Sequence, residues 1–286
     1  MDQKVEDMQR ILVPTDFSDN SWNAIAYAFA FFKGEMLDIH FLHLGFQGIA
    51  DNLDEDLHTN GLAFTAAPSK GALTKLDDLL DRIHLNFPNH KHSLYTHFEN
   101  SLFVDGIRKA SKKWDIDLIV MGTKGASGLK EVTVGSHSGA VITRVKCPTL
   151  IVPENACFQN PANIAFPTDF NMPYKNRVIK TLQSFASYHT STIKILRVVR
   201  RGGNLETEQV KNREYLSDVL QGTAHSFHWI QSPELESGLQ SFIDSMDINI
   251  IAMVGKNLNF FQRLLFKPKV EKISYHSRIP FLVLHE

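Results

Sequence analysis

Short apolar runs alternate with amphipathic stretches along this chain. A run of four to eight apolar residues predicts a buried strand, and such runs lie near 10–15, 38–44, 93–97, 117–121 and 149–152. The stretch near 21–33 is apolar almost all round and predicts a widely buried helix, whereas the stretch near 72–86 carries one leucine-rich stripe. Strands separated by helices are typical of a parallel sheet covered on both faces.

The same pattern occurs twice. Residues 11–17, ILVPTDF, are echoed 153 positions later by 164–170, IAFPTDF. A helix-and-strand pattern starting at Phe103 recurs at Leu235, displaced by only 132. The first copy is therefore longer by 21 residues, and we expect them in a long loop over 51–71, where small and polar residues gather.

This duplication predicts two tandem α/β domains, 1–154 and 162–286. Each should be a doubly wound, mostly parallel, five-stranded sheet of Rossmann-like type, with helices on both faces. The segment between them is short, so we expect the two domains to dock against one another.

Composition excludes several classes of partner and site. Thirty basic and 31 acidic residues give a net charge of −1, which indicates no nucleic-acid or membrane partner. The first residues lack the apolar core of a signal peptide, and no apolar run reaches the roughly 18 residues of a membrane span. We therefore expect a cytoplasmic protein. Two cysteines are too few for a disulfide framework, and we expect Cys147 to be a packed thiol.

The stretch 121–136, MGTKGASGLKEVTVGS, follows a predicted buried strand and holds the candidate chemistry. Its glycines Gly122, Gly125 and Gly135 could bring backbone N–H groups close to an anion, and a helix N-terminus after them would favour negative charge. The alternative is a strand-to-helix connection whose glycines only satisfy turn geometry. The motif therefore suggests, without requiring, a phosphate-binding loop.

The order of motifs resembles the universal stress protein family. Two residues separate Gly122 from Gly125, nine separate Gly125 from Gly135, Ser136 follows, and a strand opening with Cys147-Pro148 comes next. The Pro-Thr-Asp-Phe-Ser opening at 14–18 matches as well. The resemblance covers essentially the whole chain as two tandem domains and implies the adenine-nucleotide alpha-hydrolase-like fold.

The family resemblance also implies a nucleotide site. Asp16 would lie beside the adenine and ribose, the backbone near Leu44 would read the adenine edge, and the glycine loop would surround the ribose and phosphates. The backbone of His137 and the hydroxyl of Ser138 would be further donors. The nucleotide-binding residues expected on this basis are Pro14, Thr15, Asp16, Leu44, Met121, Gly122, Gly125, Gly128, Gly135, Ser136, His137 and Ser138.

The expected ligand is ATP or a related adenine nucleotide, AMP or ADP, with Mg²⁺ held through phosphate oxygens and water. The family further implies that the last strands, 148–152 and 280–284, associate edge to edge and form an intramolecular pseudo-dimer. The helices carry much aromatic surface, which is compatible with a further homo-oligomer. The protein partner is not identified by the sequence.

The second copy has lost the glycine motif. Its equivalent positions hold Val254, Asn257, Lys267 and Pro268, whereas Asp169 keeps the place of Asp16. Side chains would block close backbone approach, and proline removes a donor. We therefore expect one nucleotide per chain, bound in the first domain of a stress-response binding or regulatory module.

Two alternatives stay open: a slow ATPase or nucleotidyl-transfer enzyme on the same site, and a nucleotide-free interaction scaffold. No GxxxxGK[ST] motif occurs, so we expect at most weak ATPase activity and assign no catalytic residue. Asp16 could instead cap the first helix. The pairs His90 and His92, and His225 and His228, offer two nitrogens each, which do not complete a metal site.

Overall fold

The computed structural model describes residues 9–45, 70–123, 136–199, 204–255 and 278–285. The first half of the described chain contains β1 (Arg10–Pro14), α1 (Asp19–Phe31), β2 (Asp38–Gly45), α2 (Lys70–Asn86), β3 (Ser93–Asn100), α3 (Phe103–Lys113), β4 (Leu118–Gly122), α4 (Ser136–Arg144) and β5 (Thr149–Val152). The second half contains β6 (Asn163–Pro167), α5 (Asn176–Ser187), β7 (Thr192–Val199), α6 (Thr207–Val219), β8 (His225–Gln231), α7 (Leu235–Met246), β9 (Ile250–Val254) and β10 (Phe281–Leu284).

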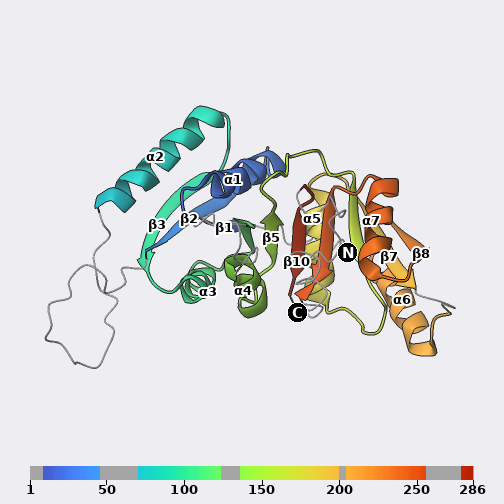
Figure 1. Ribbon diagram of the computed structural model, residues 1–286. Coiled ribbons are helices and arrows are strands. Elements are labelled where there is room, and N and C mark those ends of the chain that lie inside the picture. Colours follow the sequence, from blue (N-terminus) through green and yellow to red (C-terminus); the bar gives the residue numbers. More distant parts are fainter. Residues whose placement is uncertain (1–8, 46–69, 124–135, 200–203, 256–277, 286) are drawn as a thin grey trace, which may run out of the picture.

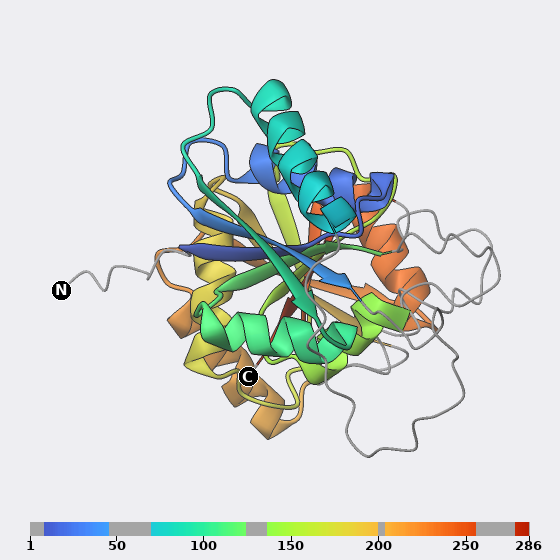
Figure 2. The same cartoon turned by 90° about the vertical axis from the view of Figure 1, so that its left-hand side faces the viewer.

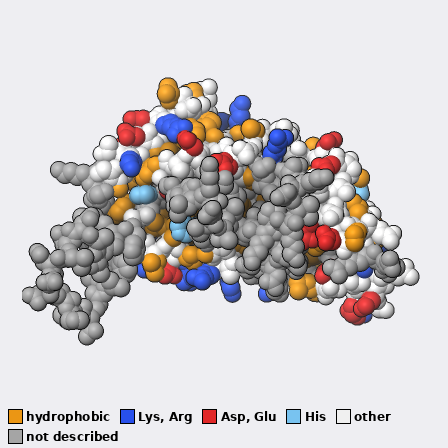
Figure 3. Space-filling model, in the orientation of Figure 1, with side chains coloured by type: hydrophobic (Ala, Val, Ile, Leu, Met, Phe, Trp, Pro, Cys, Tyr) orange, Lys and Arg blue, Asp and Glu red, His pale blue; other side chains and the backbone are white. Residues whose placement is uncertain are grey.

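These bounds confirm the predicted strands and helices of the first half to within a few residues. The loop expected over 51–71 lies mostly outside the described residues, and its last two positions belong to α2. No helix in the described part of the chain is both long and apolar enough to cross a membrane. Lys, Arg, Asp and Glu side chains are interspersed over the face drawn in Figure 3.

The strands of the described residues lie in one ten-stranded sheet, in the order β3-β2-β1-β4-β5-β10-β9-β6-β7-β8 (Figure 1). Each half contributes five parallel strands, and the halves join through the antiparallel pair β5 and β10, in which Leu150 faces Leu282. The edge-to-edge pairing expected from the family is therefore present. The two expected sheets are continuous because this pairing satisfies both edges at once.

Helices cover both faces of the sheet. In the first half, α1 and α2 lie on one face and α3 and α4 on the other (Figure 2). Alternate residues of β1 pack against the two helical layers. Ile11 and Val13 pack in the core with α1, whereas Leu12 packs in the core with α3 and α4. Period-two burial on both faces explains why the strands read as continuous apolar runs.

The core beneath α1 continues without a break into the second half. Phe31 of α1 stacks on Phe185 of α5, with ring centroids 4.4 Å apart. Nε2 of His189 donates to the carbonyl oxygen of Phe31 at 2.8 Å, and Phe158 of the connecting segment packs between Tyr27 and His189. The two halves are docked, as the short connection predicted.

Candidate functional site

The strand order reverses between β1 and β4, which are adjacent and parallel. In open α/β sheets, ligands bind beyond the carboxyl ends of the strands at such a reversal. Asp16 follows β1, and Gly122 ends β4. The structure therefore brings together two residues that the sequence separates by more than a hundred positions.

The loop after β1 is held by side-chain hydrogen bonds. Its tight turn leaves Phe17 at a φ of 63°. The backbone N–H and the hydroxyl of Ser18 both donate to Oδ1 of Asp16, and Oγ of Ser18 caps α1 by accepting from the N–H of Ser21. The helix cap is thus Ser18, and Asp16 orders the loop that leads to it.

The repeated Pro-Thr-Asp-Phe motif folds in the same way in the second half. Phe170 has a φ of 58°, and its N–H donates to Oγ1 of Thr168, as the N–H of Phe17 donates to Thr15. Asp169 accepts from the backbone N–H of Asn171. The loop geometry is therefore a property of the repeated motif, shared by the copy that lacks the glycine motif.

Gly122 packs tightly against the first turn of α1. A Cβ built on Gly122 would lie 2.5 Å from Oδ1 of Asn20 and 3.1 Å from its carbonyl oxygen. Relative to the repeated motif, α5 begins four residues later than α1, about one helical turn. Val254 occupies the equivalent position there and is buried. Packing alone thus gives a reason for glycine at 122.

Several expected site residues are buried in the fold. Pro14, Thr15 and Met121 are almost fully buried, so only their backbone atoms or the Thr15 hydroxyl could reach a ligand. The hydroxyl of Ser138 is buried and donates to the carbonyl oxygen of Thr123 at 3.5 Å. It therefore joins the first turn of α4 to the residue that follows β4, and is not exposed as a donor for phosphate.

Two other expected residues lie on the α3 side of the site. The side chain of Leu44 packs against Gly106, where a Cβ would lie 2.5 Å from Cδ2 of Leu44. His137, in the first turn of α4, is exposed and stacks on Phe103, with ring centroids 4.4 Å apart. Gly125, Gly128 and Gly135 lie outside the described residues, as do Asn257, Lys267 and Pro268; Ser136 is the first residue of α4.

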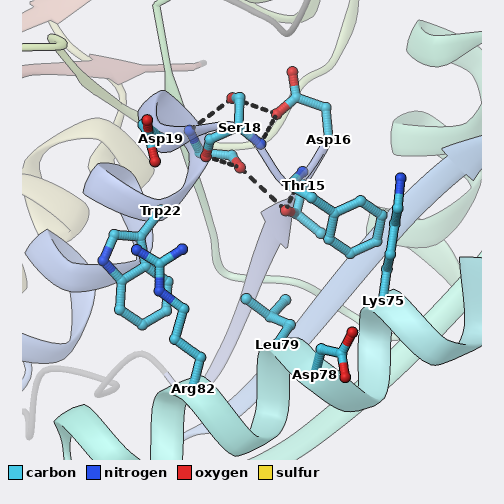
Figure 4. A pocket seen from close by; sticks show the side chains of 11 residues that line it. Thr15, Asp16, Ser18, Asp19, Trp22, Lys75, Asp78, Leu79 and Arg82 are labelled. Carbon is cyan, nitrogen blue, oxygen red and sulfur yellow. Dashed lines mark hydrogen bonds between the residues drawn. The ribbon is translucent and has the colours of Figure 1, made fainter.

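A groove of about 630 Å³ opens on the other side of the β1–α1 loop, between α1 and α2 (Figure 4). The guanidinium of Arg82 lies 3.7 Å from the ring centroid of Trp22, and Nζ of Lys75 lies 5.7 Å from that of Phe17. The lining residues are Thr15, Asp16, Phe17, Ser18, Asp19, Ser21, Trp22, Lys75, Asp78, Leu79 and Arg82. Sequence reasoning did not identify the α2 residues, although Lys75 and Arg82 flank its leucine stripe at helical spacing.

The paired histidines lie in packed surroundings. His90 and His92 stack with ring centroids 5.9 Å apart, and both contact Phe29. Burial, followed by the charge of His90, lowers the pKa of His92 to about 4. Across the residues that the structure covers, no group of three or more His, Cys, Asp or Glu side chains could hold a metal ion.

The buried cysteine is packed as expected. Sγ of Cys147 donates to the carbonyl oxygen of Ile116 at 3.3 Å, and burial raises the pKa of this thiol to about 12. Cys157 is exposed. The high pKa keeps Cys147 protonated and unreactive at neutral pH.

The sheet, its two helical layers and the strand reversal define an open α/β protein of the Rossmann-like class. The universal stress protein family model matches residues 8–153, about half of the chain and the half that carries the glycine motif. The chain belongs to the universal stress protein family.

Known relatives agree with this assignment. Universal stress protein MJ0531 of Methanocaldococcus jannaschii is 28% identical over 153 residues, covering 50% of this chain and 81% of the relative. Universal stress protein Sll1388 of Synechocystis sp. is 52% identical over 46 residues, which span 16% of this chain and only 30% of that relative.

The fold likeness extends further along the chain. The crystal structure of a universal stress protein from Archaeoglobus fulgidus covers 96% of this chain, and this chain covers 98% of that one, with a TM-score of 0.66 and 17% sequence identity. The fold likeness therefore extends over nearly the whole of both chains, and at this identity it concerns the fold alone.

Proposed function

We propose that the first half of this protein binds one adenine nucleotide per chain, ATP or a close relative, at the carboxyl ends of β1 and β4. The bound nucleotide, with Mg²⁺ on its phosphate oxygens, would make the protein a regulatory module of the stress response in the cytoplasm. The second half would stabilise the pair through the shared sheet and core.

The observation that carries the proposal is the meeting of Asp16 and Gly122 at the strand reversal, in the half that the family model matches. Helix α4 starts shortly after this junction, and its N-terminus favours negative charge. Gly122 fits a close backbone approach, but its packing against Asn20 is a sufficient reason for glycine at this position. The chemistry of the site therefore supports the proposal most directly through Asp16 and the helix terminus.

The repeated motif offers a matched test. Asp16→Asn and Asp169→Asn change the same motif in the two halves and keep the oxygen that accepts the loop N–H. We expect Asp16→Asn to weaken ATP binding at least tenfold, because a charge-assisted contact is lost. Asp169→Asn should leave the affinity unchanged. Titration calorimetry with ATP and Mg²⁺ measures both.

A second measurement identifies the ligand. Mass spectrometry of the purified protein after gentle denaturation should release an adenine nucleotide, and added ATP should raise the melting temperature as mass action requires. Equal losses in the two aspartate variants would place the site elsewhere. No released nucleotide and no thermal shift would overturn nucleotide binding and leave the scaffold alternative ahead, whereas turnover over hours would favour a slow ATPase.

A further inference from the structure

The groove between α1 and α2 adjoins the candidate nucleotide site and shares Thr15 and Asp16 with it. Asn20, in the first turn of α1, packs on Gly122, whereas Ser21 and Trp22 of the same turn face the groove. Successive helical residues point about 100° apart, so one turn serves two sites. Its volume, about 630 Å³, lies within the range that holds small molecules.

Three apolar side chains form the walls and floor of the groove. Trp22 lines the groove from α1 and Leu79 lines it from α2 (Figure 4), and Phe17 lines it from the β1–α1 loop. Trp22 is held by the guanidinium of Arg82 on its ring, and the backbone of Phe17 by its bond to Thr15. The walls therefore suit a compact apolar group.

The charges around the groove are mixed. Lys75 and Arg82 lie seven residues apart on one face of α2, with Asp78 between them. None of the three forms an ion pair with another described residue, so each side chain can pair with a ligand. The lining contains two cationic side chains and three carboxylates, Asp16, Asp19 and Asp78. Such a balance disfavours phosphates and suits a ligand that carries both charges.

In the second half, polar side chains bridge the equivalent space between α6, the loop of the repeated motif and α5. There, Nδ2 of Asn212 donates to the carbonyl oxygen of Phe170, and Nε2 of Gln209 donates to that of Asp169. The hydroxyl of Tyr215 donates to Oδ1 of Asn176. Helix α6 is thus tied to the motif loop and to α5 by polar contacts. In the first half, α2 instead presents two cations over aromatic rings beside a groove.

We propose that this groove binds a small zwitterion with an apolar body, the chemistry of a hydrophobic amino acid. Its carboxylate pairs with Lys75 and Arg82, its ammonium group pairs with Asp78, and its side chain lies between Phe17, Trp22 and Leu79. Thr15 and Ser21, whose hydroxyls bond one another at 3.2 Å, also line the groove.

Three probes with nearly the same apolar body test the proposal on the full chain. Titration calorimetry compares L-phenylalanine with 3-phenylpropionate, which lacks the ammonium group, and with phenethylamine, which lacks the carboxylate. We expect L-phenylalanine to bind one per chain and each truncated probe to bind about tenfold more weakly. No binding of L-phenylalanine or L-leucine up to their solubility limits would overturn the proposal, as would equal affinity for 3-phenylpropionate.

Neighbouring aspartates provide a matched pair of variants. Asp77 and Asp78 are both exposed on α2, and only Asp78 lines the groove. Asp78→Asn should weaken L-phenylalanine about tenfold without weakening 3-phenylpropionate, whereas Asp77→Asn should change neither. Loss of both probes on Asp78→Asn, or equal effects of the two variants, would contradict the assigned pairing.

Competition with ATP separates this site from the nucleotide site. We expect L-phenylalanine to bind in the presence of saturating ATP and Mg²⁺, and to bind Asp169→Asn as it binds the unchanged protein. Mutually exclusive binding would show that the groove is part of the nucleotide site and overturn the two-site arrangement. Failure of ATP binding alone would leave the groove proposal standing.

Discussion

Asn20 packs directly against Gly122, at the place where the strand order reverses between β1 and β4. A Cβ on Gly122 would come within 2.5 Å of the Asn20 side-chain oxygen and 2.9 Å of its Cγ, distances that real Cβ atoms do not adopt. The first turn of α1 therefore lies directly on the end of β4. This contact is particular to the first half, where α1 begins about one turn earlier than its counterpart.

The contact predicts that Gly122 and Asn20 are energetically coupled. Gly122→Ala should lower the free energy of unfolding by about 1–3 kcal/mol through overpacking. Asn20→Ala in the same chain should recover part of that loss, because two of the three close atoms disappear. Urea unfolding of the single and double variants measures the coupling.

Gly71 is the control for this series. A Cβ there meets nothing within 4 Å, and the residue is the second of α2. Gly71→Ala should stabilise the protein by about 0.5–1 kcal/mol, since alanine is the better helix former. Additive losses at 20 and 122 would contradict the coupling.

The contact between Phe31 and Phe185 predicts coupling between the halves. Both rings are almost fully buried and stack across the boundary. Phe185→Ala should cost about 3–5 kcal/mol of unfolding free energy. In the double variant with Phe31→Ala, the loss of unfolding free energy should be smaller than the sum of the two single losses. The difference should be about 0.5–1.5 kcal/mol, the value of an aromatic pair.

Phe242 gives the matched control for the aromatic pair. It is equally buried, but it packs in the core on the opposite face of the sheet. Phe31→Ala and Phe242→Ala should therefore add within error in denaturant unfolding. Simple additivity of Phe31→Ala with Phe185→Ala would show that the two halves are not coupled through this stack.

Asn23 should stabilise the segment that connects the two halves. Its Nδ2 donates to the carbonyl oxygens of Pro153 and Ala156 at 3.0 and 3.1 Å. Asn23→Ala should lower the free energy of unfolding by about 1–3 kcal/mol, because part-buried carbonyls lose their donor. Asn86→Ala, which removes an exposed bond within α2, is the control and should cost less than 1 kcal/mol. Equal effects in chemical denaturation would contradict this role.

Buried histidines predict a loss of stability in mild acid. Burial lowers the pKa of His92 from 6.5 to about 4. Between these values the unfolded chain binds more protons than the folded protein, so the free energy of unfolding falls as the pH falls through this window. His97 and His285 have pKa values lowered to about 4 as well, mainly by burial.

His92→Gln should flatten this pH dependence, whatever it does to stability at pH 7. The measurement is urea unfolding at several pH values between 7 and 4, with Lys91→Gln as the control on the neighbouring exposed position. An unchanged slope for His92→Gln would mean that the pKa of His92 is the same in the folded and the unfolded chain. Chemical shifts of its ring carbons report the same titration directly.

The sequence by itself determined the repeat, the strands, the helices and their alternation. Local periodicity carries that information, because each apolar run must bury its own side chains. It also indicated that Asp16 and Gly122 belong to one site, because both follow strands that are neighbours in a doubly wound sheet. It could not identify Asn20, because packing between α1 and β4 depends on where the helix starts.

The pairing of β5 with β10, which joins the two sheets, was expected from the family resemblance and is present in the structure. Only the tertiary structure decided two further features. Ser138 lies buried against Thr123 because the first turn of α4 packs on the residue that follows β4. Lys75, Asp78 and Arg82 line a groove because α2 lies beside α1, a contact between elements that the chain separates by a long segment. Long-range packing sets each of these arrangements, and local patterns in the sequence carry no record of it.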